Sequence, residues 1–178
     1  MAPAFSVSPP LLLELVYWLR LVLGKHIARS IALNTSIPRH VQLSSRRPVP
    51  LLKTLHKELP AEGITALPLD ITRPSTLAPA FEGAHTVVSM VGLLHGTPAQ
   101  FEKIQVNGTK EVALAAKQAG ARLIHISAIG ADSTSSVAYA RTKGQGEEVV
   151  MDICPNATII RPSLVFGPED DFFNVRVL

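Results

Sequence analysis

The sequence predicts an α/β fold built on a parallel sheet with helices on both faces. Segments of β-branched and aliphatic residues alternate along the chain with longer segments of helical period. These apolar segments are nearly continuous, which is typical of strands buried on both faces. One domain with an aliphatic core is expected, because 47% of the 178 residues are hydrophobic and only 5% are aromatic. Strands that alternate with helices form βαβ units, so we expect the strands to run parallel.

Each expected strand is a short apolar run bounded by polar residues, glycine or proline. The expected strands are residues 40–44, 64–69, 86–91, 122–127 and 157–161. Each expected helix carries apolar residues at helical spacing. The expected helices are residues 24–34, 49–59, 75–81, 97–119 and 135–152. Thr97, ahead of a proline, predicts a capped helix start, and Gly120 predicts the end of that helix. Ser135 or Ser136 is expected to cap the last helix.

Residues 11–23 form an apolar run that we expect to be a short buried helix or strand. The run has charged residues at Glu14 and Arg20 and is too short to span a membrane as a helix, which needs about 20 apolar residues. No positive side chain precedes it, as a secretory signal would require. A targeting or membrane-surface role and an altered start of the coding sequence are the alternatives. We therefore divide the chain into an atypical segment, residues 1–23, and a domain, residues 24–178.

Charge, cysteine content and histidine spacing argue against a nucleic-acid partner, a disulfide framework and a metal site. The net charge is only +3 and no dense run of Lys and Arg occurs, so we expect no nucleic-acid partner. Cys154 is the single cysteine, which excludes an internal disulfide framework. The six histidines are dispersed and none has the spacing of a metal-ligand pair, so we expect no metal site.

Tyr139 and Lys143 form the pair that points most directly to chemistry. They lie four residues apart on an expected helix and therefore share one face. A nearby cation lowers the pKa of a phenol, and such a tyrosine exchanges a proton with a carbonyl or alcohol while a hydride moves to or from a nicotinamide. Ser127, at the end of the preceding strand, would hydrogen-bond the reacting oxygen. On a solvated helix such a pair usually has no function, so the prediction depends on the combination with Ser127.

Four further motifs along the chain agree, in their order, with one protein family. They are Asp70-Ile71, Val91-Gly92, Val106-Asn107-Gly108-Thr109 and Arg161-Pro162-Ser163-Leu164-Val165-Phe166-Gly167-Pro168. Together they resemble the short-chain dehydrogenase/reductase superfamily in its extended or atypical branch. Residues 157–174 are similar to the accessory nucleotide-binding subunits of mitochondrial respiratory complex I, whose relatives include proteins of ubiquinone biosynthesis.

The resemblance implies a Rossmann-type, doubly wound parallel sheet that holds a nicotinamide dinucleotide. The positions implied to contact the cofactor are Gly24, Asp70, Ile71, Gly92, Asn107, Lys143 and Pro162. In the complex I subunit the nucleotide is regarded as mainly structural. Tyr139 and Lys143 would then serve to bind the ribose and not to catalyse, and the sequence leaves both alternatives open. The implied location is mitochondrial, on the matrix side of the inner membrane. Complex I or quinone-synthesis proteins are the implied partners.

Arg46 and Arg47 favour NADP(H) over NAD(H). They directly follow the second strand, where an acidic residue would bind a ribose 2′-hydroxyl, and no acid is present there. Arginine suits a 2′-phosphate by charge and by the geometry of its guanidinium group. An ordinary basic loop is the alternative.

The chain departs from the family pattern at its glycine-rich turn. Gly24 matches the last glycine of the turn, whereas Leu21 and Trp18 stand where the other two glycines are expected. We therefore expect a fold that is incomplete at the first strand and the glycine-rich turn, which puts cofactor binding by this chain in doubt. The sequence stops at Leu178, where extended members continue into a substrate-binding portion, so we expect that portion to be missing.

Three functions follow from these observations. The first is an accessory NAD(P)(H)-binding protein of the mitochondrial respiratory or ubiquinone machinery. The second is an active NADP-dependent oxidoreductase that uses Ser127, Tyr139 and Lys143. The third is a truncated product that binds no nucleotide.

Gly144 and Gly146 lie inside the expected helix of Tyr139, and each costs a helix about 1 kcal/mol relative to alanine. Either sequence drift or close packing of the helix explains them.

Overall fold

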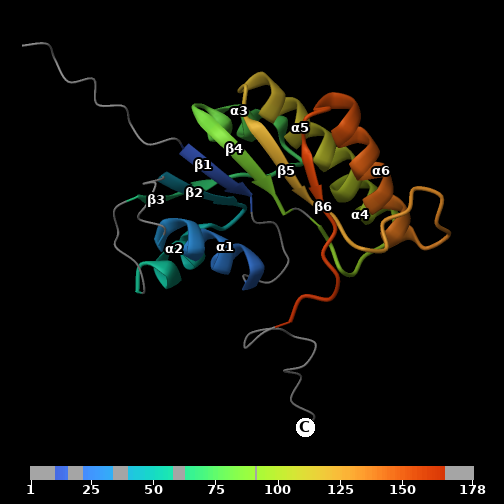
Figure 1. Cartoon of the computed structure of the whole chain (residues 1–178), viewed down its shortest axis with the longest axis horizontal. Coiled ribbons are helices and arrows are strands. Elements are labelled where there is room, and N and C mark those ends of the chain that lie inside the picture. Colours follow the sequence, from blue (N-terminus) through green and yellow to red (C-terminus); the bar gives the residue numbers. More distant parts are fainter. Residues whose placement is uncertain (1–10, 16–21, 34–39, 58–62, 91, 167–178) are drawn as a thin grey trace, which may run out of the picture.

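A single parallel sheet of six strands organises the protein (Figure 1). The computed structural model describes residues 11–15, 22–33, 40–57, 63–90 and 92–166. In order across the sheet the strands are β3 (Ile64–Pro68), β2 (His40–Ser45), β1 (Leu11–Leu15), β4 (Ala84–Ser89), β5 (Arg122–Ile126) and β6 (Thr158–Ile160). Every neighbouring pair is parallel. The strand order reverses between β1 and β4, so the predicted α/β, Rossmann-type, doubly wound sheet is confirmed.

Helices cover the two faces of this sheet in separate groups (Figure 1). One group consists of α1 (Val22–Leu33) and α2 (Val49–Leu55). The other consists of α3 (Leu77–Phe81), α4 (Pro98–Phe101), the π-helix η2 (Glu102–Gly108), α5 (Thr109–Gln118) and α6 (Ala138–Ile153). A short 3₁₀ helix, η1 (Pro74–Thr76), leads into α3. This division follows from right-handed crossovers, which put helices on opposite faces when the strand order changes direction.

Strand β1 differs from the expectation of a sheet that is incomplete at its first strand. Leu13 pairs with Gln42 of β2 on one side and with Val87 of β4 on the other, so β1 lies at the centre of the sheet. A run of leucines suits a strand with neighbours on both sides. The glycine-rich turn predicted to be altered, with Trp18 and Leu21, lies outside the described residues. None of the helices in the described ranges has the length and hydropathy needed to cross a bilayer.

The elements expected from the sequence agree with the structure to within a few residues, apart from two helices. The expected helix over 97–119 is divided into α4, η2 and α5, with a π-helical middle. Its predicted ends are confirmed: Thr97 makes a capping box with Gln100, and Gly120 has the positive φ of +67° that suits glycine. Helix α6 begins later than expected.

The predicted serine cap of α6 is wrong. The helix starts at Ala138, and the residue before it, Val137, makes no side-chain cap. Ser135 Oγ accepts a hydrogen bond from the Val137 backbone N–H at 3.2 Å and so belongs to the preceding turn. The carbonyls of Ser135 and Ser136 accept hydrogen bonds from Arg141 Nη1, so a side chain from the helix holds this turn.

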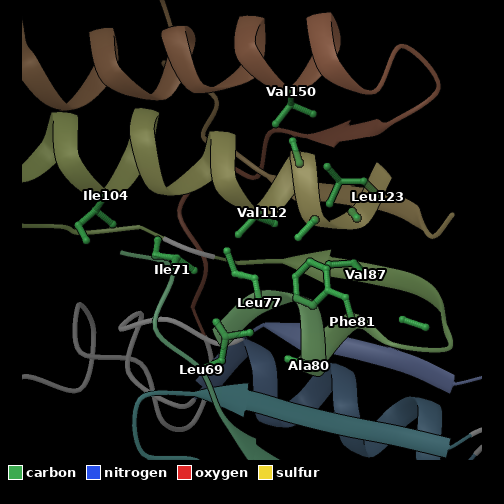
Figure 2. Packing of buried hydrophobic residues seen from close by; sticks show 14 residues of the cluster. Leu69, Ile71, Leu77, Ala80, Phe81, Val87, Ile104, Val112, Leu123 and Val150 are labelled. Atoms are coloured by element: carbon green, nitrogen blue, oxygen red, sulfur yellow. The ribbon is translucent and has the colours of Figure 1, made fainter. Parts of the chain in front are cut away.

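The larger core lies between the sheet and the layer formed by α3, η2, α5 and α6 (Figure 2). Phe81 is fully buried beside Leu77 and Val87, and Val112 and Leu123 extend the cluster toward Val150 on α6. Burial of aliphatic side chains of this kind contributes about 1.5–3 kcal/mol each. A smaller core, which includes Leu43 and Leu55, packs α1 and α2 against β2 and β3.

The sheet is covered less completely than expected on the face that carries α1 and α2. Over β4, β5 and β6 this face borders an open hollow of about 410 Å³, lined in part by Val88, Ile124, Ile126 and Ile160. Ile160 remains 45% exposed there. Ile27 and Ile31 of α1 are the only helix residues in the described part of the chain that line this hollow.

Candidate functional site

The predicted site residues follow the strands at one edge of the sheet. In a parallel sheet all carboxyl ends meet at the same edge, and ligands bind there next to the point where the strand order reverses. Most of the predicted positions lie one to three residues beyond a strand end: Arg46 and Arg47 (β2), Asp70 and Ile71 (β3), Gly92 (β4), Ser127 (β5) and Pro162 (β6). Gly24 lies in the first turn of α1, and Asn107 is exposed on η2. The structure thus brings most of the predicted positions to one edge.

Lys143 is a buried cation at this edge. Its side chain is 5% exposed, and Nζ donates a hydrogen bond to the backbone oxygen of Ile126 at 3.1 Å. Burial lowers the pKa of Lys143 to about 8, although the nearby Glu147 carboxylate acts in the opposite direction. The ammonium is therefore held at the end of β5 by α6.

Gly92 borders the space beside this ammonium. A Cβ atom at residue 92 would lie 3.2 Å from Lys143 Nζ and 3.8 Å from Gln105 Oε1. The contact with Lys143 Nζ would be tighter than ordinary van der Waals packing, whereas the contact with Gln105 Oε1 would be an ordinary one. Glycine therefore leaves open a position that any other side chain would begin to fill, directly in front of Lys143.

Tyr139 lies one helical turn before Lys143 and is half-buried. Its ring packs edge-on against Phe101, with ring centroids 5.9 Å apart. Burial raises the pKa of Tyr139. The expectation that the lysine lowers this pKa is therefore wrong, because loss of hydration of the phenolate outweighs any help from the neighbouring cation.

Ser127 presents a buried hydroxyl with an unfilled hydrogen-bonding capacity. Its backbone N–H donates to Ile160 O at 2.7 Å, which fixes the residue between β5 and β6. Its Oγ atom is buried and has no hydrogen-bond partner within the described part of the chain. A buried hydroxyl without a partner costs free energy, so a ligand that bonds to it would be favoured.

His125 lies just before this serine and belongs to the core. It is 1% exposed, and Nδ1 lies 3.4 Å from Ser89 Oγ. Burial and the positive charge of Lys143 lower its pKa to about 3. The imidazole is therefore neutral at physiological pH and packs as part of the core.

The opposite half of the edge combines Arg46 with Asp70. Burial alone would raise the pKa of Asp70, but hydrogen bonds from Thr72 and the positive charges of Arg46 and Arg73 together lower it. The Asp70 carboxylate accepts from the Thr72 backbone N–H at 2.9 Å and from its hydroxyl at 2.8 Å. The carboxylate is thus charged at neutral pH and lies in the field of Arg46, as residues at one end of a dinucleotide site would.

Ile71, Pro162 and Arg47 are placed differently from one another. The Ile71 side chain is fully buried and contacts the core, so only its backbone is available at the edge. Pro162 is half-buried, and its carbonyl accepts from the Ile129 N–H at 3.0 Å. Arg47 is exposed, and its backbone N–H donates to Ser45 Oγ.

Helix α6 packs so closely that glycine is required at two positions. A Cβ on Gly144 would lie 2.2 Å from the backbone nitrogen of Ser133, and one on Gly146 would lie 2.4 Å from the backbone oxygen of Gln105. Real Cβ contacts do not occur at such distances. Close packing, and not drift, therefore explains both glycines. Arg161 adds a further link by donating to both carboxylate oxygens of Glu147 on α6.

Gln105 and Thr142 are site residues that sequence reasoning missed. Gln105 is 1% exposed and donates to Thr142 Oγ1 at 2.8 Å. Two signals were available: Gln105 directly precedes the Val106–Thr109 motif, and Thr142 lies inside the Tyr139–Lys143 motif. Neither pattern by itself predicts that the two side chains meet. No group of three His, Cys, Asp or Glu side chains in the described residues is arranged to hold a metal ion.

Comparison with known proteins identifies the family. A family model described as NAD(P)H-binding matches residues 23–171. A ceramide reductase of Caulobacter vibrioides is 32% identical over 149 residues, which are 83% of this chain and 44% of that protein. Subunit 9 of the complex I alpha subcomplex from mouse mitochondria is 36% identical over 113 residues, covering 62% of this chain and 30% of that protein. Protein fmp52 of Aspergillus niger, also mitochondrial, is 32% identical over 160 residues, or 84% of this chain and 65% of that protein.

Solved structures show the same fold. A Bacillus halodurans protein described as an NAD-dependent epimerase/dehydratase superposes with a TM-score of 0.71 at 16% identity, over 90% of this chain and 74% of that one. A Citrobacter triphenylmethane reductase solved with NADP(H) gives 0.65 at 19% identity, over 92% of this chain and 51% of that one. The chain spans less than half the length of the ceramide reductase and of the mouse subunit. It belongs to the NAD(P)H-binding family, near the complex I subunit 9 proteins, which confirms the resemblance inferred from its motifs.

Proposed function

We propose that this chain is an NADP(H)-binding domain that serves as an accessory protein of the mitochondrial respiratory machinery, with a mainly structural nucleotide. One observation carries the proposal: at the edge where this fold binds dinucleotides, the buried ammonium of Lys143 on α6 lies beside Gly92, which follows β4, and at the end of β5, where the Ser127 hydroxyl has no partner among the described residues. Family membership and the mitochondrial complex I relatives support it.

Each half of the edge offers groups suited to one half of a dinucleotide. Lys143 would bind the nicotinamide ribose hydroxyls, with the Gly92 backbone beside it and Asn107 and Pro162 flanking this half. Gly24, in the first turn of α1, would allow a pyrophosphate to approach that helix.

The adenosine half would use the ends of β2 and β3. Arg46 and Arg47 would bind a ribose 2′-phosphate, and the region of Asp70 and Ile71 would contact adenine. The charge of Arg46 helps to lower the pKa of Asp70, so the two side chains lie within electrostatic range of each other. This arrangement favours NADP(H), because Arg46 and Arg47 both follow β2, where an acidic residue would otherwise bind a 2′-hydroxyl.

A second candidate function is an NADP-dependent oxidoreductase, which is favoured by the Ser127 hydroxyl because it has no partner among the described residues. When bound, the nicotinamide supplies or accepts the hydride. Ser127 would donate a hydrogen bond to the substrate oxygen. Tyr139, whose pKa is raised by burial, holds its proton at neutral pH and would donate it to that oxygen. Similarity to a ceramide reductase also supports this candidate.

Titration of the purified chain with NADPH and with NADH, followed by nucleotide fluorescence, tests the proposal. We expect saturable binding that favours NADPH, and loss of that preference in Arg46→Gln/Arg47→Gln. A folded chain that binds neither nucleotide would refute the proposal and support the alternative of a truncated, non-binding product. Equal affinity for both nucleotides in the native chain would refute the roles of the two arginines.

Substitution of Tyr139 separates the accessory protein from the enzyme. In Tyr139→Phe the accessory function predicts nearly unchanged NADPH retention, and no NADPH oxidation with quinone or carbonyl substrates in either protein. The enzyme function predicts turnover in the native chain that collapses in the variant. Ser127→Ala should reduce turnover in the same way, because it removes the hydroxyl that bonds the substrate.

The proposed partner and location are tested in cells. We propose that the protein lies on the matrix side of the inner mitochondrial membrane and associates with complex I or with quinone-synthesis proteins. Native gel electrophoresis of solubilised mitochondria should show the tagged protein with one of these assemblies. Exclusive recovery from a non-mitochondrial fraction would contradict this part of the proposal.

A further inference from the structure

The open hollow over β4, β5 and β6 lies on the face of the sheet that carries α1, away from α6 (Figure 1). Its volume of about 410 Å³ falls within the range of about 300–1,000 Å³ that is usual for small-molecule sites. Ile27 and Ile31 of α1 form one wall, and side chains of the three strands form the floor. None of the positions assigned to the nucleotide lines this hollow, so a ligand bound here would occupy a separate site.

The floor of the hollow changes from polar to aliphatic along the strands. Alternate residues of a strand share one face, and the pairing of neighbouring strands places these residues in rows. The three rows are Thr86 with Arg122, Val88 with Ile124, and Ile126 with Ile160. They extend over about 13 Å, because four residues separate the first row from the last. The first row carries a hydroxyl and a guanidinium, whereas the other two rows are entirely aliphatic.

Arg122 is a cation at the polar end of the hollow. Its side chain is exposed and makes no hydrogen bond or ion pair within the described residues. His85 lines the same end, and its Nδ1 lies 2.8 Å from Thr86 Oγ1, which leaves Nε2 for a ligand. A guanidinium binds a carboxylate through two parallel hydrogen bonds. The hollow therefore offers an anion site at one end and an apolar surface along the rest of its length.

We propose that the hollow binds a straight-chain fatty acid, with its carboxylate on Arg122 and its acyl chain along the two aliphatic rows. Such a ligand has the same order of polarity as the floor, since one anionic end is followed by methylenes. Each methylene that leaves water favours binding, and the ligand would also cover Ile160, which is 45% exposed.

The size of the hollow favours an acyl chain over a docked helix. Three turns of helix, about 10 Å across and 16 Å long, have a volume of about 1,300 Å³. That is roughly three times the volume of the hollow, so most of a helix would project from it. A single acyl chain is slender enough to lie between α1 and the edge of the sheet.

Titration of the purified chain with octanoate, decanoate and dodecanoate below their micelle-forming concentrations tests the proposal by calorimetry. We expect one saturable site per chain. The affinity should rise about fourfold for each two added methylenes, because the open hollow covers about half of the acyl chain. In nuclear magnetic resonance spectra the amide signals of Ile124 and Ile160 should shift and saturate with dodecanoate, whereas that of Gly92 should not.

Substitutions at the two ends of the hollow separate the charge from the apolar contact. Arg122→Gln should weaken dodecanoate binding about tenfold and leave the binding of uncharged dodecanol unchanged, and Arg122→Lys should recover part of the loss. Ile160→Gln should weaken both ligands about threefold. Lys110→Gln and Met151→Gln are the matched controls and should bind as the native chain does. They replace an exposed cation of α5 and a 41% exposed apolar side chain of α6.

Three results would overturn the proposal. They are an affinity that does not depend on chain length, equal dodecanoate binding in Arg122→Gln and the native chain, and uptake of many molecules per chain, as a detergent-like association gives. A native chain that binds no dodecanoate and sediments as a dimer, while Ile160→Gln sediments as a monomer, would assign this face to a second copy instead. None of these measurements requires NADPH, so they decide the proposal separately from the nucleotide-binding function.

Discussion

Gly144→Ala is the substitution in which two physical effects oppose each other most clearly. In the interior of a helix, alanine is more favourable than glycine by about 1 kcal/mol. Gly144 lies inside α6, so helix propensity alone predicts a more stable protein. The new Cβ, however, would lie 2.2 Å from Ser133 N and 2.6 Å from Asp132 C. These are backbone atoms, which cannot turn away as a flexible side chain does.

The packing cost outweighs the propensity gain. Contacts below 3.0 Å do not occur for real Cβ atoms, so α6 or the 132–133 turn must move by about 1 Å. The turn resists displacement because the Asp132 carboxylate accepts from the Thr134 N–H and hydroxyl, and the Asp132 N–H donates to Ala140 O. Overpacking costs about 1–3 kcal/mol, and contact with a tied backbone belongs at the upper end. We expect a net loss of roughly 1–2 kcal/mol in the free energy of unfolding.

Urea denaturation followed by circular dichroism measures this difference, with an unchanged m-value as the sign that the unfolded state is unaffected. Gly130→Ala is the matched control, because no atom lies within 4 Å of a Cβ there and its φ is not positive. That variant should be as stable as the native chain or more stable by about 0.4–1 kcal/mol. A Gly144→Ala protein more stable than the native chain would refute the close contact between α6 and the 132–133 turn.

Three further predictions follow from buried polar groups. Thr109 Oγ1 is buried without a partner among the described residues, whereas the Thr142 hydroxyl both accepts and donates a hydrogen bond. Thr109→Val should therefore stabilise the protein by about 1 kcal/mol, and Thr142→Val should destabilise it by about 1–3 kcal/mol. Thermal unfolding that ranks the two variants in the reverse order would contradict this prediction. Lys143 has a folded-state pKa of about 8, below the ordinary 10.5, so the folded state loses this proton at lower pH than the unfolded state does. The free energy of unfolding should therefore rise with pH between those two values, and Lys143→Met should lack the rise. An equal rise in both proteins, measured by urea denaturation, would contradict the burial of the ammonium. His125 has a folded-state pKa of about 3, below the ordinary 6.5, because it is buried in the neutral form. The free energy of unfolding should therefore fall as the pH falls through that range, and His125→Gln should lose less stability in acid than the native chain does. Equal acid sensitivity of the two proteins would contradict the prediction.

Most elements were predictable because their signals are local. Thr97 and Gly120 mark the two ends of the helical region between β4 and β5 through capping and positive φ, and both depend on a few neighbouring residues. The leucine run at 11–15 was ambiguous between helix and strand, because only its pairing with β2 and β4 makes it a strand. The serine cap of α6 failed because Ser135 and Ser136 take part in a turn held by Arg141.

The site itself was predictable in its position more than in its chemistry. Strand-end positions placed Gly92 and Ser127 at one edge, since the carboxyl ends of parallel strands coincide, and the spacing from Tyr139 added Lys143 on the following helix. The pKa of Tyr139 was predicted with the wrong sign, because sequence spacing gives the neighbouring cation but not the burial of the phenol. Gln105 was missed for a related reason: its partners belong to a loop and a helix distant in the sequence.

Nuclear magnetic resonance of the isotopically labelled chain during titration with NADPH tests most directly whether the carboxyl edge of the sheet is a nucleotide site. The amide signals of Arg46, Gly92 and Ser127, which follow three different strands, should shift together and saturate at one nucleotide per chain. Gly83 and Gly120, which precede β4 and β5 at the opposite edge, should not shift. Shifts confined to that opposite edge, or none at all in a folded protein, would contradict the account.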